Sequence, residues 1–587
     1  MRHAAPVAVL VPSVLALLLV AAPLGADHSQ HPHGSVQPHS TAPASAAEGA
    51  QPPQGTAPAD AMDHAHHDHA APAKLGTVRF PSSCNSAAQP AVERGVALLH
   101  SFAYASATQA FAQAAELDPA CAMAPGGVAM SWLHPIWAPP TAEELAAGRA
   151  AALRATELAA GETTTARERS YVAAIAAFHR DADTLDHRTR LRAFEGALRQ
   201  TAADHPDDGE AAIFHALAIL GVAYNSPHDP SFALQRQAAA ILDGLLPRHP
   251  DHPGIAHYMI HSFDYPEVAE LALTAARAYA AIAPDAPHAL HMPSHIFVRL
   301  GLWDETIASN LDSARVADRQ TVVSHPGATA FDALHAIDYL VYGYLQTGRH
   351  EEAKKLLDRV NAVTALDQGQ FAAAYALAAV PARYALELRD WSTAAALPDP
   401  PAVLPWERFP YALALVDFGR AVGAARAGDV DRARPAVARL AALHQQLAAA
   451  PRAGFDWASQ VEVQHLAAAG WLAHAEGDAA EARRLLRAAA DLEDSISKHP
   501  VTPGSLLPAR EMLADLELDL GEPATALAEY EASLRTAPKR YNTIAGAVRA
   551  AEALGDEGKV KALRGELEAL VGGGGAEDAV ETSPTTR

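Results

Sequence analysis

The histidines between residues 257 and 295 are the side chains of this sequence best placed to do chemistry. His257 and His261 are four residues apart. His291 and His295 are also four apart, and His288 precedes them by three. Residues four apart lie on one face of an α-helix, so each pair can present two imidazoles to the same side. The second pair follows the first by 34 residues. Two such pairs on adjacent helices can supply four nitrogen ligands to a metal ion, with zinc or copper expected.

The same histidines have a structural interpretation. They fall near positions where helical repeats bury packing residues, and a buried histidine is often satisfied by a carbonyl or a carboxylate. Pro293 disfavours a straight helix, so a kink could either aim the rings inward or separate them. The sequence has no HExxH or CxxC motif, and no glutamate accompanies the pairs as a general base. Metal ligands and core histidines therefore both stay open.

Three other polar residues are weaker candidates for a polar groove. His335 and Asp338 are three residues apart and would share a helix face in the next repeat. His134 lies among aromatic residues before a loop. The alternative for all three is a packing or capping role.

A second histidine cluster lies near the N-terminus, at His64, His66, His67 and His69. Clustered imidazoles beside carboxylates bind copper, nickel or zinc, and histidine-rich tracts are compositional signals of metal binding. The alternative is a solubilising spacer that binds metal only incidentally. Residues 27–75 around the cluster are rich in Ala, Pro, Gln, Ser and His, which predicts a disordered tail.

Residues 1–26 have the pattern of an export signal. Arg2 gives a positive start, residues 7–20 form an apolar stretch too short for a comfortable membrane span, and Ala22 and Ala26 offer small residues for cleavage. The rival interpretation is an uncleaved N-terminal anchor. We expect a periplasmic or secreted protein with no stable membrane span after cleavage.

The chain has two cysteines, Cys84 and Cys121. In an exported protein an even pair predicts a disulfide, since no other cysteine competes. The alternative is two unrelated small core residues.

The composition favours an all-α protein and disfavours a nucleic-acid partner. Of the 587 residues 50% are hydrophobic, many of them alanine, and only 6% are aromatic. Alanine is the best helix former. Asp and Glu outnumber Lys and Arg by 68 to 45, a formal net charge of −23, so the clustered basic groups that phosphate binding needs are not expected. This charge favours attraction of cations.

The helices that must position these residues recur with a fixed spacing. Steps of 12, 4, 3 and 5 join Gly95, Ala107, Phe111, Ala114 and Pro119, and they recur from Ala514 through Ala526, Tyr530 and Ser533 to Pro538. Small residues let two helices approach, the bulky residue packs between neighbours, and the proline ends the second helix. Such a hairpin cannot bury its apolar face alone, so the units must stack.

These positions resemble those of the tetratricopeptide repeat (TPR), a helix–turn–helix unit of about 34 residues. The resemblance covers most of residues 85–570 and implies an all-α, TPR-like α-solenoid of antiparallel helix pairs over 76–570. Residues 571–587 contain a run of glycines near their start, which predicts a flexible tail. The chain is also similar to secreted bacterial TPR-repeat proteins of unassigned role, which share the opening Phe80-Pro81 to Cys84 and the central histidine-rich segment.

Three functions are compatible with the sequence. The first, implied by the TPR resemblance, is an exported scaffold that binds a peptide or protein partner in its concave groove. The second is a metal-handling protein in which tail and central histidines cooperate. The third is a metal-dependent enzyme built on the helical array. The sequence has no Gly-rich phosphate loop and no GxSxG motif, so binding is predicted rather than catalysis.

Overall fold

The computed structural model describes residues 73–136, 139–450 and 455–572. The expected signal peptide, nearly all of the predicted N-terminal tail and residues 573–587 lie outside the described residues, as do the tail histidines His64, His66, His67 and His69. Within the described ranges the chain is all-α, as predicted. The strand pairing found there is a single isolated bridge between Thr329 and Leu366.

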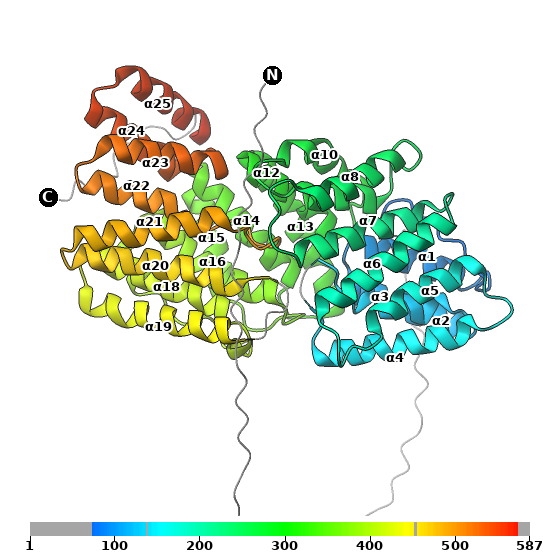
Figure 1. Cartoon of the computed structure of the whole chain (residues 1–587). Helices are drawn as coiled ribbons and strands as arrows, with labels where there is room; N and C mark the ends of the chain where they lie inside the picture. Colours follow the sequence, from blue (N-terminus) through cyan, green and yellow to red (C-terminus); the bar gives the residue numbers. More distant parts are fainter. Residues whose placement is uncertain (1–72, 137–138, 451–454, 573–587) are drawn as a thin grey trace, which may run out of the picture. The chain divides into compact units, whose positions relative to one another are not determined.

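Helices follow one another along the described chain, most of them joined by short turns (Figure 1). The N-terminal helices are α1 (Gln89–His100), α2 (Tyr104–Leu117), α3 (Met123–Ser131), α4 (Ala142–Ala159), α5 (Ala166–His179), α6 (His187–Asp204), α7 (Gly209–Tyr224) and α8 (Ala233–Leu245). The central helices are α9 (Pro253–Phe263), the 3-10 helix η1 (Ala269–Ala272), α10 (Leu273–Ile282), α11 (Pro287–His291), α12 (Pro293–Leu300), α13 (Trp303–Ser324), α14 (Phe331–Gln346), α15 (His350–Asn361) and α16 (Phe371–Glu387). The C-terminal helices are α17 (Trp391–Ala395), the 3-10 helix η2 (Trp406–Arg408), α18 (Pro410–Arg426), α19 (Val430–Ala449), α20 (Trp457–Ala475), α21 (Ala479–Ser495), α22 (Ala509–Asp519), α23 (Pro523–Thr536), α24 (Tyr541–Leu554) and α25 (Glu557–Val571).

Consecutive helices form antiparallel pairs, and the pairs stack. Helix α1 packs on α2, α18 on α19, α20 on α21 and α22 on α23. The first helix of one pair also contacts the first helix of the next, so that α14 contacts α16, α16 contacts α18, and α18 contacts α20. This nearest-neighbour stacking of helix hairpins is that of a repeat array. The predicted TPR-like fold of antiparallel helix pairs is therefore confirmed.

The small and bulky positions that predicted the repeat pack as expected. The ring of Phe111 on α2 lies against Gly95 on α1 and against Gly127 on α3. A β-carbon added at Gly95 would lie 2.6 Å from Cζ of Phe111, and one at Gly127 would lie 2.4 Å from the same ring. Tyr530 and Gly546 repeat this arrangement near the C-terminal end, where an added β-carbon would lie 2.3 Å from Cζ of Tyr530. The bulky residue thus fixes the distance between neighbouring helices.

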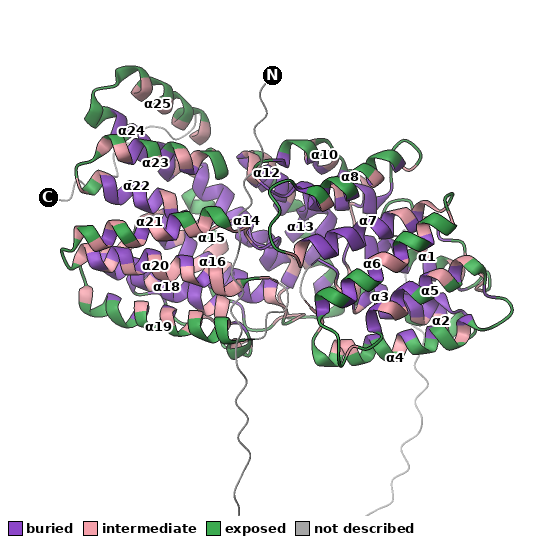
Figure 2. Ribbon diagram, in the orientation of Figure 1, coloured by how far each residue is buried: buried purple, intermediate pink, exposed green. Residues whose placement is uncertain are grey.

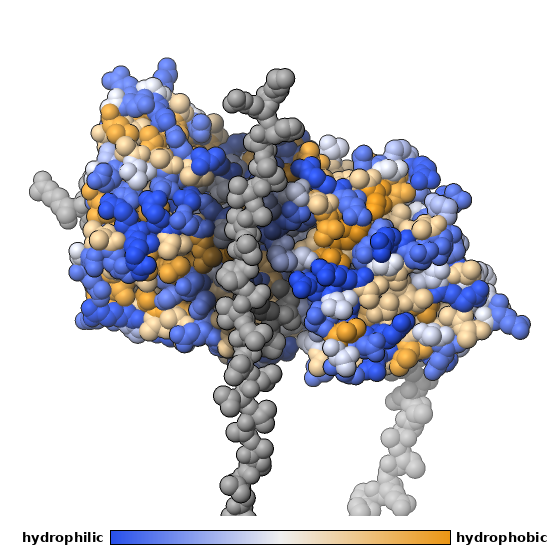
Figure 3. All heavy atoms as spheres, in the orientation of Figure 1, coloured by the Kyte–Doolittle hydropathy of each residue, from blue (hydrophilic) through white to orange (hydrophobic). Residues whose placement is uncertain are grey.

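Helices in contact with two neighbouring pairs are the most buried. Nearly all residues of α7, α14 and α16 are buried, whereas α4 and α19 bury only a few residues each, most of them alanine (Figure 2). Polar and apolar side chains are interspersed over the visible face (Figure 3). Among the described helices, none has the length and apolarity to cross a membrane.

The predicted disulfide between Cys84 and Cys121 is present. It joins the segment before α1 to the turn before α3, with the two α-carbons 4.7 Å apart. The bridge closes a loop of 37 residues around the first helix hairpin.

Two segments far along the chain return to the central helices. In the connection between α21 and α22, the carbonyl of Val501 accepts a hydrogen bond from the hydroxyl of Tyr339 on α14, at 3.1 Å. Before α24, Arg540 donates to the hydroxyl of Tyr342, also on α14, at 2.7 Å. Helix α14 therefore contacts segments more than 150 residues away, in addition to its neighbours in sequence.

Candidate metal centre

Six buried histidines lie together where the central helices meet. The first histidine group is His257, His261 and His288, and the second histidine group is His291, His295 and His335. In each group one ligand nitrogen per residue lies within 4.8 Å of the others. Five of the six are the histidines that the sequence singled out for their spacing. The sixth, His335, was a weaker candidate from the next repeat.

The arrangement differs from the expected four-ligand site. The spacing allows the two pairs to face each other across adjacent helices, and in the structure each pair belongs to a different group of three. Residues one turn apart on a helix lie closer to each other than to the next helix. A neighbouring helix then adds one imidazole to each pair, His288 from α11 and His335 from α14.

Pro293 does not separate the second pair. It is the first residue of α12, where a missing backbone N–H costs nothing, and the preceding Met292 keeps helical torsion angles (φ −53°, ψ −35°). The short helices α11 and α12 therefore follow almost without a break. The ring centroids of His291 and His295 are 4.9 Å apart.

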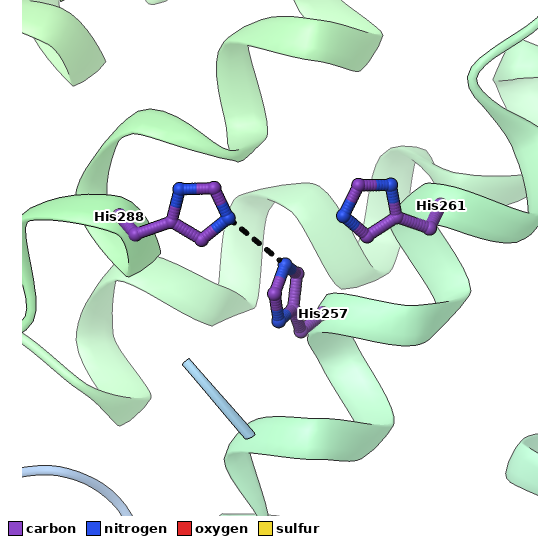
Figure 4. Close-up of side chains that lie close together, drawn as sticks. All are labelled: His257, His261 and His288. Atoms are coloured by element: carbon purple, nitrogen blue, oxygen red, sulfur yellow. Dashed lines mark hydrogen bonds between the residues drawn. The ribbon is translucent and has the colours of Figure 1, made fainter. Parts of the chain in front are cut away.

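In the first histidine group the three rings point toward one another (Figure 4). Nδ1 of His257 lies 2.6 Å from the carbonyl oxygen of His100 and donates to it, so Nε2 carries the lone pair of the neutral ring. That Nε2 lies 3.2 Å from Nε2 of His288. Both nitrogens of His261 are buried without a hydrogen-bond partner among the described residues. A buried polar group in this state costs free energy, and metal coordination through one of the two nitrogens would recover part of it.

In the second histidine group, hydrogen bonds fix the tautomers of two rings. Nδ1 of His291 lies 2.6 Å from Oδ1 of Asn310, whose amide nitrogen donates to the Thr306 carbonyl. Nδ1 of His295 lies 3.0 Å from Oδ2 of Asp264. Both partners accept, so each Nδ1 carries the hydrogen and each Nε2 carries a lone pair. These two Nε2 atoms lie only 3.0 Å apart. Two neutral rings cannot bond through two lone pairs, so this contact calls for a cation, either a proton or a metal ion.

Burial disfavours protonation of these histidines. It lowers the pKa of His257 to about 3 and lowers the pKa of His261, His288, His291 and His335 well below the ordinary value, with neighbouring imidazoles adding to the effect. Burial also lowers the pKa of His295, although Asp264 acts in the opposite direction. The six rings are therefore neutral at neutral pH, which is the form that ligates metal.

Asp264 is the carboxylate that orients His295. Burial acts to raise its pKa, but Lys498 and Arg299 hold it well below the ordinary value. Nζ of Lys498 lies 3.1 Å from Oδ2, and Nε of Arg299 lies 3.0 Å from Oδ1. Asp264 thus stays ionised and is already paired with two cations.

Three of the six rings therefore have the outer hydrogen bond typical of metal ligands. His257 donates to a backbone carbonyl, His291 to an amide oxygen and His295 to a carboxylate. Such partners hold a ligating ring in one tautomer and orientation.

A third group, His100, Glu210 and His252, provides a contrast. Each histidine places Nε2 2.9 Å from a different oxygen of Glu210. Nδ1 of His100 contacts the Tyr258 hydroxyl at 2.9 Å, and Nδ1 of His252 accepts from the Gly254 amide at 3.2 Å. Every ring nitrogen here has a hydrogen-bond partner within the protein, so the contacts explain this group as a structural network.

The remaining predicted groove residues belong to neither histidine group. Asp338 is buried beside Arg383, with Oδ1 3.4 Å from Nε, and burial raises its pKa to about 6 against the opposing effect of Arg383. His134 follows α3 with a positive φ of 46°, and its ring centroid lies 4.6 Å from that of Tyr104. Neither residue lines the cleft described next.

A surface cleft of about 1160 Å³ reaches toward the histidine groups. Tyr224, Tyr265 and Lys498 are among its lining residues. The ring of Tyr224 lies 6.1 Å from that of His261 between centroids. One layer of side chains therefore separates the cleft from both groups, since Lys498 also contacts Asp264.

Sequence comparison found no family model and no curated protein that matches this chain. Among solved structures, the crystal structure of yeast Tom70 shares 12% identity over 84% of this chain and 99% of that one, with a TM-score of 0.31. The TPR domain of P58(IPK) shares 12% identity over 80% of this chain and 99% of its own, with a TM-score of 0.19. Scores this low do not bear on function, and the fold assignment rests on the helix contacts themselves.

Proposed function

We propose that this protein is an exported helical-repeat scaffold that binds transition-metal ions at the two histidine groups. The observation that carries the proposal is the contact between Nε2 of His291 and Nε2 of His295, at 3.0 Å with both Nδ1 atoms already donating. A bound cation removes the repulsion between the two lone pairs. The net charge of −23 favours the approach of cations.

Metal analysis of the untagged, full-length mature protein tests this function. The double variant His257→Ala/His295→Ala removes one ligand from each group, and His465→Ala, a partly exposed histidine on α20, serves as the matched control. All three proteins keep the same N-terminal histidines, so any metal held there cancels in the comparison. We expect the wild type and the control to retain more metal after dialysis than the double variant. Equal metal in all three would refute the proposal.

The cleft supports a second function, binding of a peptide or protein partner. It combines an aromatic wall with charged groups, because Trp457 lies in the same lining as Lys498 and Asp229. The indole of Trp457 stacks on Tyr411 at 4.2 Å between centroids, which holds it in place. Aromatic anchors of this kind dominate peptide and protein interfaces.

Selection of binding peptides from a displayed library tests the second function. Peptides selected on the wild type should lose binding to Trp457→Ala and keep binding to Arg154→Ala, an exposed substitution on α4. If both variants bind the selected peptides as well as the wild type, the cleft is not the binding surface.

A further inference from the structure

We infer that the two histidine groups hold a pair of copper(I) ions side by side, as one dinuclear centre. This inference rests on the proposed metal-binding function and specifies the ion, the stoichiometry and the spacing.

The two groups are close enough to act as one centre. The ring centroids of His261 and His295 are 6.3 Å apart, and those of His288 and His291 are 6.2 Å apart. Each of these contacts joins a ring of the first group to a ring of the second. Since a metal ion lies about 2 Å from a ligating imidazole nitrogen, ions in the two groups would be direct neighbours.

The donor atoms restrict the choice of metal. All six side chains of the two groups are imidazoles, with no carboxylate and no thiolate among them. Calcium, magnesium and manganese prefer oxygen ligands, while imidazole suits zinc, copper, iron and nickel. Both cysteines of the chain are joined in the disulfide, so no thiolate is available to either group. The donor set thus leaves zinc, copper, iron and nickel, and charge must decide among them.

Charge favours the monovalent ion. Three neutral imidazoles bring no negative charge to either group. The carboxylate beside them, Asp264, is already paired with Lys498 and Arg299. Burying charge without compensation is costly, and the cost rises steeply with the amount of charge. A pair of copper(I) ions brings half the positive charge of a pair of zinc(II) ions, and copper(I) accepts three ligands without a fourth.

Copper(I) titration of the full-length protein tests the pair. Under anaerobic conditions with ascorbate, a chromophoric copper(I) chelator competes with the protein, and a zinc titration is run in parallel. The proteins are the wild type, the control His465→Ala, the double variant His257→Ala/His295→Ala, and the single variants His261→Asn and His335→Asn. Circular dichroism checks helix content, and the polar single substitutions decide the result if the double variant does not fold.

We expect the wild type to hold two more copper(I) ions than the double variant and each single variant to lose one. After oxidation, the frozen wild type should give the broadened EPR signal of two coupled copper(II) ions, and each single variant the narrow signal of one. If the double variant holds only one ion fewer than the wild type, or if the oxidised wild type gives the signals of two uncoupled copper(II) ions, the dinuclear centre is overturned. Uptake of zinc but not copper(I) by the two groups overturns the copper assignment and leaves the proposed function standing. Equal copper and equal zinc in the wild type and the double variant overturn both.

Discussion

Removal of the disulfide is expected to destabilise the N-terminal repeats far more than the rest of the array. Replacing Cys84 and Cys121 by serine opens a loop of 37 residues. In the chain-entropy model, closing a loop of this length stabilises the folded state by about 4 kcal/mol at 25 °C. The Cys121 side chain is also buried, at 2% exposure, so the serine hydroxyl adds a small desolvation cost.

The loss of stability must be measured separately in each helix hairpin, because a long repeat array does not unfold in one step. Hydrogen exchange followed by mass spectrometry reports each helix hairpin separately. We expect exchange in α1, α2 and α3 to accelerate by up to about a thousandfold in the double serine variant, as 4 kcal/mol implies. Exchange in α20 and α21 should stay unchanged.

Reduction provides the control. A reductant should accelerate exchange in α1 to α3 of the wild type and leave the serine variant as it was. If the serine variant and the oxidised wild type exchange alike in these helices, the bridge does not stabilise the hairpin. Two free thiols in the exported protein would show that the bridge does not form, and this would also contradict the prediction.

Further perturbations have equally definite outcomes. Gly127→Ala forces a β-carbon against Phe111 and should lower the free energy of unfolding of the N-terminal repeats by about 1–3 kcal/mol, measured by urea titration. His261→Leu removes two unpartnered buried nitrogens, so it should leave the metal-free protein as stable or more stable by about 1 kcal/mol, while the rise in Tm on adding metal becomes smaller because only the second histidine group still binds. Glu210→Gln should weaken the structural network, lowering Tm without changing metal content. Burial, with Asp367 adding to it, raises the pKa of Asp332 to about 7, so the folded chain holds a proton there that the unfolded chain releases near pH 4. The free energy of unfolding therefore falls as pH rises from 4 to 7. The full pKa shift corresponds to about 4 kcal/mol, and the effect is smaller than this because Asp332 is only half-buried. The variant Asp332→Asn should have a higher Tm than the wild type at pH 8 but not at pH 4.

The fold could be predicted from the sequence because its determinants are local and repeated. Gly95 and Phe111 are 16 residues apart, within one helix hairpin, and their contact recurs along the chain. The disulfide also joins residues close in sequence. Neither prediction required knowing how distant segments pack.

The candidate centre could be predicted only in part. The spacing of His257, His261, His291 and His295 placed them together, because equivalent helices of successive repeats are neighbours. Their division into two groups depends on which helix supplies the third imidazole. The outer partner Asn310 comes from α13 and has no signal in its own sequence context. Such partners are set by tertiary packing, which a spacing pattern does not contain.

The return of distant segments to α14 has a consequence for how this protein can evolve. Repeat arrays usually gain or lose units freely, because each unit touches only its neighbours. Here the hydroxyls of Tyr339 and Tyr342 bond to Val501 and Arg540, across several intervening hairpins. Duplicating or deleting one hairpin between them would carry both partners away from α14. We therefore expect a duplication or deletion of a hairpin between α14 and α21 to disrupt both contacts, whereas substitutions and changes in loop length can leave them intact.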